Sequence, residues 1–377
     1  MSAPSAARAE ALLRRMVEIA SPSGSEQDLA AFLERELREW GFRTRRDAVG
    51  NVLAERGPAD GPVIMLVGHM DTVPGPVPVR REGDVLYGRG TVDAKGPLAT
   101  MVCAAASART GPVRVVVAGV VEEETFGRGA THLALGPRPD AVIVGEPNGW
   151  AGVGIGYKGR VVVRYEVRRP AAHTASPEEQ ASDAAVAFHH AVLRYCEEHV
   201  TGPRAFDRPL ATLLRVEGTI EHARLTLAVR TPPGFDLPRF EAFLAEAAGD
   251  ARLWIDDRTP AVRVDHRGAV VRALCAGVRA QGGRPTLKLK TGTADLNIVE
   301  PVWGCPAAVY GPGDSALDHT GHEHIDLREY ATAIEVLRHG LEALAAELAG
   351  GAAPGATAGT GAAGAGGRAT GARDAVR

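Results

Sequence analysis

The chain has 377 residues, with 43 Lys and Arg against 46 Asp and Glu, a formal net charge of -3 and 45% hydrophobic residues. This ordinary globular composition excludes a collagen, a coiled coil and a wholly disordered protein. We expect no nucleic-acid partner, because such a partner usually requires a basic excess, and no long run of Lys and Arg occurs here.

The N-terminal region predicts two amphipathic helices. Apolar positions recur at spacings of three and four residues from Ala6 to Ile19 and from Glu26 to Trp40. Charged side chains interrupt the first of these segments, so it is not the apolar core of a signal peptide. No segment approaches the ~18 consecutive apolar residues that span a bilayer. We therefore expect neither secretion by that route nor a membrane partner.

The cysteines indicate the compartment. None of the four belongs to a Cys-x-x-Cys pair, and they lie far apart, at Cys103, Cys196, Cys275 and Cys305. This spacing indicates neither a thiolate zinc site nor a disulfide framework. Free cysteines are typical of a reducing compartment, so we expect a cytoplasmic protein.

Three short runs of β-branched and other apolar residues come next, at 63–67, 113–121 and 141–144. Such nearly continuous runs are typical of strands that are buried on both faces. Between the first two runs, residues 97–109 carry apolar side chains along one face, which predicts a crossover helix. Buried strands joined by helices predict an α/β layered sheet.

After Gly159 the pattern predicts a second, inserted domain. The strand at 161–167 becomes alternating in its second half, and alternation indicates a sheet with one face in water. A helix, a strand, a helix and a short strand follow, at 178–198, 224–229, 238–248 and 253–255. This order resembles a β-α-β-β-α-β unit, so we expect a small α+β domain here.

The first pattern returns from Ala269, with a helix to Gln281, strands at 286–290 and 307–310, and a helix at 327–348. That last helix opens with Asp326-Leu-Arg-Glu329, a capping-box pattern. We therefore expect one domain made of residues 1–157 and 267–349, split around an inserted domain of residues 158–266. Residues 350–377 are rich in Gly and Ala and lack aromatic residues, which predicts a disordered tail, and we assign it no part in the predicted function.

Histidine and carboxylate residues follow the predicted buried strands. His69 and Asp71 come directly after the strand at 63–67, and the aspartate can accept a hydrogen bond from the second ring nitrogen of a metal-bound histidine. The run Glu122–Glu124 follows the second strand, where adjacent carboxylates need cations or solvent to compensate them. Glu146 follows the third strand.

Two further candidates lie elsewhere in the chain. Asp93 stands in a glycine-rich turn before a helix, where the ordinary interpretation is an N-cap, and His319 follows a tight turn after the strand at 307–310. His322 and His324 compete with His319, which ranks first because it follows the turn most closely. Mixed histidine and carboxylate ligands at one sheet edge suit a pair of zinc-like ions about 3.5–4 Å apart.

One motif points to a different chemistry. Gly154-Ile-Gly156-Tyr-Lys-Gly159 satisfies the G-x-G-x-x-G pattern of dinucleotide-binding proteins. It runs into a predicted strand rather than a helix, so it has no helix N-terminus to offer a pyrophosphate. We therefore reject dinucleotide binding. No G-x-S-x-G or P-loop pattern occurs, which removes two common hydrolase and NTPase interpretations.

The order and spacing of five segments resemble the M20 metallopeptidase family: His69-Met-Asp71, Asp93-Ala-Lys-Gly96, Glu123-Glu124, Gly145-Glu146-Pro147 and His319. The resemblance implies a catalytic domain with two zinc ions, for which cobalt can substitute, interrupted by a lid domain. It implies that His69 and Glu146 bind one ion and Glu124 and His319 the other, with Asp93 bridging. It also implies that Glu123 is the general base and that Asp71 orients His69.

In the inserted domain, the segment from Pro170 to Pro177 resembles the family segment whose histidine reaches the scissile carbonyl. The resemblance implies that His173 is an oxyanion donor, acting within one chain or across a homodimer. Many relatives also carry an Asn-x-Ile-Pro element before an Asp-x-Arg strand. Residues 216–230 lack that asparagine and keep only Arg230, with Ala228 in place of the acid.

Two segments, 290–297 and 311–320, look most like the family branch that releases lysine or ornithine from a LysW-type amino-group carrier protein. The resemblance implies a small acidic carrier protein as substrate and a role in lysine and arginine biosynthesis. The alternatives are a deacylase for N-acetylornithine or succinyl-diaminopimelate, and a dipeptidase. An alternative of another class is a binding protein that has lost catalysis, against which the complete set of ligands and Glu123 argues.

Overall fold

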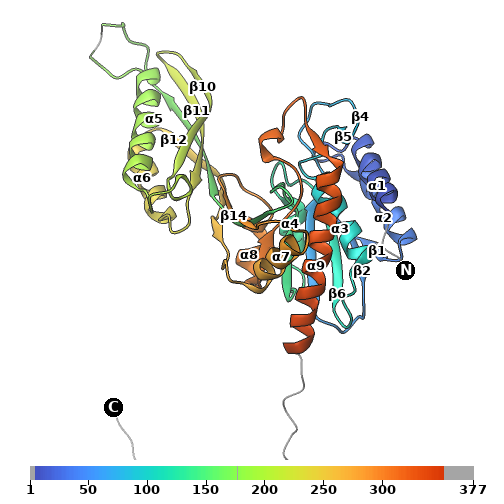
Figure 1. Ribbon diagram of the computed structural model, residues 1–377. Helices are drawn as coiled ribbons and strands as arrows, with labels where there is room; N and C mark the ends of the chain where they lie inside the picture. The colour runs from blue at the N-terminus through green and yellow to red at the C-terminus, as the bar shows by residue number, and fades with distance from the viewer. Residues whose placement is uncertain (1–4, 176, 352–377) are drawn as a thin grey trace, which may run out of the picture.

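The computed structural model describes residues 5–175 and 177–351, so all but the first two residues of the predicted tail lie outside the described residues. Figure 1 shows two bodies joined by a narrow connection. The large body holds the first and last parts of the chain, and the small body is formed by residues 159–259. Each body has a hydrophobic core of its own. The domain boundaries at 158 and 266 stay a prediction.

A nine-stranded sheet of order β1-β2-β6-β3-β7-β15-β8-β13, with β14 paired to β8, forms the centre of the large body. Strands β6, β3, β7 and β15 run parallel to one another, and β7 is buried along its whole length. The predicted α/β layered sheet is therefore confirmed. The strands are β1 (Arg43–Arg46), β2 (Val52–Arg56), β3 (Val63–His69), β6 (Arg114–Val120), β7 (Ala141–Val144), β8 (Gly152–Tyr157), β13 (Val262–Arg263), β14 (Thr286–Lys290) and β15 (Ala307–Val309).

Helices of the large body pack against this sheet and against one another. Helix α3 packs on β3 and on both α1 and α9, and α9 packs in turn on α7. Residues Lys95–Ala106 of α3 are all buried, because the helix lies between the sheet and its neighbours. The helices are α1 (Ala6–Glu18), α2 (Gln27–Glu39), α3 (Lys95–Ser107), α4 (Arg128–Ala134), α7 (Ala269–Ala280), α8 (Leu296–Trp303) and α9 (Leu327–Gly351).

The small body is a four-stranded sheet of order β10-β11-β9-β12, with every pair antiparallel. Figure 1 shows helices α5 and α6 together on one face of this sheet. The order β-α-β-β-α-β along the chain agrees with the prediction. The elements are β9 (Gly159–Arg168), α5 (Ala181–Glu198), β10 (Leu210–Gly218), β11 (His222–Thr231), α6 (Leu237–Ala248) and β12 (Arg252–Thr259).

A third, small sheet of order β16-β5-β4 lies in the large body. Its strands are β4 (Arg80–Glu82), β5 (Val85–Tyr87) and β16 (His324–Asp326). Strand β5 comes just before the glycine-rich turn that carries Asp93, and β16 comes just after the segment that carries His319. The sheet therefore links two regions that are far apart in the sequence.

The structure agrees with the prediction for the glycine motif and differs from the predicted capping box. Gly154 lies in β8, which β9 follows, so the glycine motif precedes no helix, as predicted. A Cβ on Gly154 would lie 2.8 Å from Cβ of Val309, so a neighbouring strand accounts for this glycine. The capping box is wrong for Glu329: Asp326 accepts from the Glu329 amide at 3.4 Å, but the Glu329 carboxylate accepts from the amides of Trp150 and Gly313, each at 3.0 Å.

Two further features of the described residues concern membrane spans and cysteines. Within residues 5–175 and 177–351, no helix is long and apolar enough to cross a membrane. All four cysteines are free and buried. The predicted absence of a disulfide framework is therefore confirmed.

Candidate metal centre

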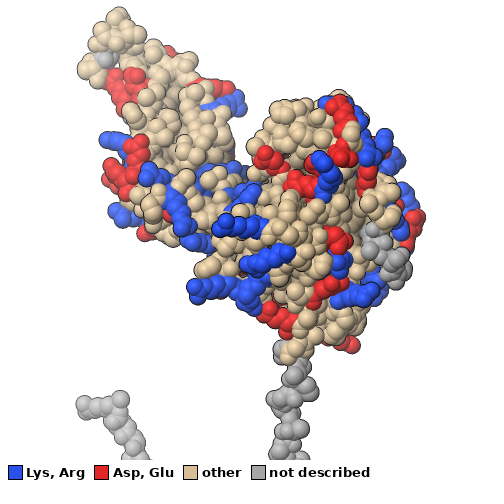
Figure 2. Space-filling model, viewed as in Figure 1, with Lys and Arg blue, Asp and Glu red and all other residues tan. Residues whose placement is uncertain are grey.

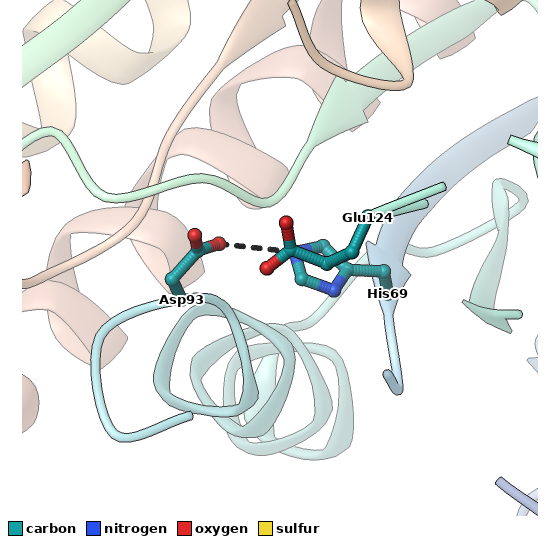
Figure 3. A group of neighbouring side chains, drawn as sticks. All are labelled: His69, Asp93 and Glu124. Carbon is teal, nitrogen blue, oxygen red and sulfur yellow. Dashed lines mark hydrogen bonds and ion pairs between the residues drawn. The ribbon is translucent and has the colours of Figure 1, made fainter. Parts of the chain in front are cut away.

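The predicted ligands lie together at the carboxyl edge of the central sheet. His69 is the last residue of β3, Glu123 and Glu124 follow β6, and Glu146 follows β7. Because these three strands are parallel neighbours, their carboxyl ends meet at one edge, where α/β sheets place ligands. Asp93 reaches the same edge from the turn before α3 (Figure 3).

Asp93 lies between two histidines. Its Oδ1 is 3.1 Å from Nε2 of His69, and its Oδ2 is 3.0 Å from Nε2 of His319. Each carboxylate oxygen therefore faces a different imidazole, which is the arrangement expected of a carboxylate that bridges two cations. The peptide bond between Asp93 and Ala94 is cis.

The two glutamates pair with the two histidines. Oε2 of Glu124 lies 3.1 Å from Nε2 of His319, and Oε1 of Glu146 lies 3.9 Å from Nε2 of His69. Figure 3 shows the side chains of His69, Asp93 and Glu124 converging, and one ligand atom from each lies within 4.8 Å of the others. The five residues predicted as ligands thus form one connected group.

Asp71 contacts this group without being one of the five predicted ligands. Nδ1 of His69 lies 2.9 Å from the backbone carbonyl oxygen of Asp71 and 3.5 Å from its carboxylate. The carboxylate itself accepts from the amides of Glu123 and Glu124, both at 3.1 Å, and from the hydroxyl of Ser23 at 2.7 Å. Asp71 therefore positions the turn after β6 as well as the imidazole, a second contact that the sequence did not indicate.

The electrostatics of the group call for cations. Burial raises the pKa of Glu123 and of Glu146 well above the ordinary range, and neighbouring carboxylates raise both further. Hydrogen bonds to Asp93 and Glu124 raise the pKa of His319 to about 10. Burial would lower the pKa of His69, but hydrogen bonds to Asp71 and Asp93 outweigh it and raise that pKa. Such a cluster must take up protons or bind cations, and its mixed donors fit divalent zinc-like ions.

Four of the five predicted ligands and Glu123 line a cavity of about 390 Å³ between the two bodies; the four are Asp93, Glu124, Glu146 and His319. Figure 2 shows a hollow between the bodies, with acidic and basic side chains along its rim. Arg160 and Arg230 line the cavity from the small body, and Lys290 lines it from β14. Arg230 donates to the Thr293 hydroxyl at 3.1 Å, and Lys290 donates to the Pro147 carbonyl at 2.8 Å. The cavity is therefore lined both by carboxylates and by three cationic side chains, Arg160, Arg230 and Lys290, which we call the cationic wall.

The structure does not bring His173 to this cavity. His173 is exposed in the connection between β9 and α5, and its Nδ1 accepts from the amide of Ala175 at 3.0 Å. Figure 1 shows this connection at the far tip of the small body, away from the large body. Within one chain in this arrangement, His173 is not placed to contact a substrate carbonyl.

Two further residues, a histidine ranked lower and an acid not singled out in the sequence, lie near the predicted ligands. The ring of His324 packs against Tyr87 at an interplanar angle of 36°, with ring centroids 5.0 Å apart, and its Nδ1 lies 2.8 Å from the carbonyl oxygen of His322. Asp295 is 1% exposed, neither of its carboxylate oxygens has a hydrogen-bond partner, and burial raises its pKa to about 7. The Asp295 carboxyl also contributes, after burial, to the raised pKa of Glu123. Its position in the segment 290–297 was the only sequence signal.

Comparisons with known proteins show what this chain is similar to. Residues 65–343 match the model of the family described as Peptidase family M20/M25/M40. The chain is 41% identical over 357 residues to LysW-lysine hydrolase of Deinococcus radiodurans, covering 90% of this chain and 98% of that one. It is 42% identical over 328 residues to a Pyrococcus horikoshii protein named as a candidate LysW-lysine/LysW-ornithine hydrolase, covering 86% and 94%. Aminopeptidase PepT of Bacillus cereus shares the fold, with a TM-score of 0.76 and 19% identity over 90% of this chain and 99% of that one.

Proposed function

The chain belongs to peptidase family M20/M25/M40, and we propose that it is a metal-dependent amide hydrolase that releases lysine or ornithine from the C-terminal glutamate of a small acidic LysW-type carrier protein. One observation carries the proposal: the two oxygens of Asp93 face His69 and His319 inside a carboxylate-rich cavity. The proposed setting is the cytoplasm, because all four cysteines are free.

Two zinc ions are the proposed cofactors, with cobalt as a substitute. His69 and Glu146 would hold one ion, His319 and Glu124 the other, and Asp93 would bridge them. When bound, such a pair acidifies water and polarises the amide carbonyl. The proposal follows from the connected contacts among these five side chains, which offer nitrogen and oxygen donors of the type that zinc prefers.

Glu123 is the proposed general base. It lines the cavity beside the ligands, and its backbone is fixed by the hydrogen bond to Asp71. Its carboxylate would accept a proton from the attacking water and then deliver that proton to the leaving amino group. A buried carboxylate with a raised pKa can do both, because its two protonation states are closer in free energy near neutral pH.

The cationic wall of the cavity fits the charges of the proposed substrate. An amide between a carrier glutamate side chain and the α-amino group of lysine leaves two free carboxylates next to the bond that is cleaved. Arg230 and Lys290 both line the cavity and can each offer hydrogen bonds to a carboxylate. A substrate without these charges gains nothing from this wall.

Replacing Arg230 with methionine is expected to lower kcat/KM for the lysine-charged carrier about 10–100-fold, because one charge-assisted hydrogen bond contributes about 1.5–3 kcal/mol. The loss should be mainly in KM, measured from initial rates of lysine release. Arg224→Met is the matched control, since Arg224 lies on the same strand but pairs with Glu166 at 3.0 Å on the surface. Equal losses in both variants would contradict substrate recognition by Arg230.

We propose that the protein is a homodimer joined through β10. This strand forms an edge of its sheet, and Leu210, Leu214 and Val216 on it are 55%, 59% and 57% exposed. An exposed apolar edge strand readily pairs with another strand. We propose that His173 acts on the partner subunit in such a dimer, because it does not reach the cavity of its own chain.

Changing both Leu214 and Val216 to glutamate is expected to convert the dimer to a monomer, measured by light scattering. If His173 donates to the oxyanion across the dimer, this variant and His173→Ala should both lose roughly 10²–10³-fold in kcat. Leu135→Glu is the control, because Leu135 is 81% exposed on the large body. A monomeric wild type would contradict the dimer, and a fully active monomeric variant would contradict action across it.

A substrate panel tests the proposed function. The zinc-loaded protein is incubated with carrier-linked lysine, carrier-linked ornithine, N-acetylornithine, N-succinyl-diaminopimelate and dipeptides, and the released amines are measured by mass spectrometry. We expect turnover of the carrier-linked amino acids with the highest kcat/KM. Turnover confined to the small molecules would replace the proposal with a deacylase or a dipeptidase, and no turnover by a protein that binds metal would favour a binding protein.

A further inference from the structure

Glu323 is a completely buried glutamate just outside the metal centre. Its Oε1 accepts from the amides of Gly90, Val92 and Asp93, at 3.0, 2.9 and 3.1 Å. Its Oε2 accepts from Nη1 of Arg89 at 2.8 Å. Both oxygens are therefore directed at a single turn, the one that carries Asp93.

These contacts satisfy backbone amides that would otherwise be buried without a hydrogen-bond acceptor. A buried backbone amide without an acceptor is destabilising, and one oxygen of Glu323 accepts from three such amides. Arg89, whose side chain is 14% exposed, balances the carboxylate charge. The backbone of Glu323 adds a further bond, because its carbonyl accepts from the amide of Gly88 at 3.1 Å. The turn at 88–93 is thus held along its length by one residue.

Glu323 also belongs to the segment of the second histidine. It follows His319 by four residues and directly precedes β16, which pairs with β5 on the other side of the turn. One residue therefore joins the turn of Asp93 to the segment of His319. Those are the two parts of the chain that must hold a fixed separation for Oδ2 of Asp93 to lie 3.0 Å from His319.

We propose that Glu323 is a positioning residue for the metal pair, which fixes the Asp93 carboxylate between His69 and His319. Glu323 does not line the cavity, so it acts through the turn that it binds. The inference rests on the proposed role of Asp93 as a bridge. Residues that orient metal ligands typically change metal affinity about 10–100-fold when they are replaced.

Zinc and cobalt affinities of purified full-length variants test this role by chelator competition. We expect Glu323→Ala to weaken binding of the ion pair about 10–100-fold and to change the absorption spectrum of the cobalt form. Glu323→Gln and Arg89→Met should have smaller effects, since glutamine keeps an acceptor for the three amides and the Arg89 variant leaves Oε1 unchanged. Glu323→Gln also keeps the test decisive if the alanine variant does not fold, because any measurable weakening in it supports the role.

Asp47→Ala is the matched control. Oδ1 of Asp47 also accepts from three backbone amides, those of Val49, Gly50 and Asn51, in a turn between β1 and β2. Loss of such a turn alone should leave zinc affinity unchanged. Wild-type affinity and spectrum in folded Glu323 variants would overturn the inference while leaving the proposed function intact. A wild-type protein that binds no metal would overturn both.

Discussion

Glu123→Gln is expected to lower kcat for lysine release about 10²–10⁴-fold while the metal content stays at the wild-type level. The size of the loss is that of a general acid-base group, because glutamine cannot accept the proton of the attacking water. Metal content should not change, since Glu123 lines the cavity but is not one of the five proposed ligands. Steady-state kinetics and elemental analysis of the same preparation measure both quantities.

The neighbouring glutamate provides the control for this variant. Glu122 lies next to Glu123 but pairs with Arg128 at 2.6 Å, outside the cavity. Glu122→Gln should therefore keep kcat within a few-fold of wild type. A Glu123→Gln enzyme that loses its metal would move Glu123 into the ligand set, and one that keeps wild-type kcat would remove it from catalysis.

Asp93→Ala is expected to lose the metal pair and to lower kcat about 10³-fold or more, since bound metal contributes several kcal/mol of transition-state stabilisation. The reason is geometric. Asp93 is the residue that faces both His69 and His319, so its removal deprives both ion positions of a donor at once. Elemental analysis after gel filtration, combined with kinetics at increasing added zinc, measures the effect.

A surface aspartate serves as the control. Asp256 pairs with Arg164 on the small body, so Asp256→Asn should bind metal and turn over substrate as the wild type does. The pair of variants also separates two explanations. If Asp93→Ala keeps two tightly bound ions, Asp93 does not bridge them. If it folds poorly even at high zinc, its contribution is structural instead.

The sequence predicted the parts of the fold that depend on local pattern. The β-branched runs of β3, β6 and β7 were recognisable because strands buried on both faces have no polar alternation. Strand β1, with the sequence Arg-Thr-Arg-Arg, was missed because an exposed edge strand need not be apolar. Helix α8 was missed because it is short and contains Pro301. Glu329 matched a capping pattern, yet its carboxylate binds two amides from distant loops.

The candidate site, like the fold, could be predicted from the sequence only in part. That His69, Glu124 and Glu146 follow neighbouring strands is visible in the sequence, because parallel strands bring their carboxyl ends to one edge. That Asp71 holds the turn after β6 is not visible, and neither is the isolation of His173 at the tip of the small body. The role of His319 in preference to His322 and His324 rested on its place after a turn. In the folded chain it is His319 whose Nε2 lies 3.0 Å from Asp93.

The amino-acid sequence by itself determined which donors stand at the strand ends and hence which chemistry this protein can perform. Only the tertiary structure decided which donors meet, because Asp93 and His319 are brought together by loops whose paths depend on packing and on buried hydrogen bonds. Glu323 illustrates the reason: its four acceptor contacts join residues more than two hundred positions apart, and no local pattern encodes such a contact.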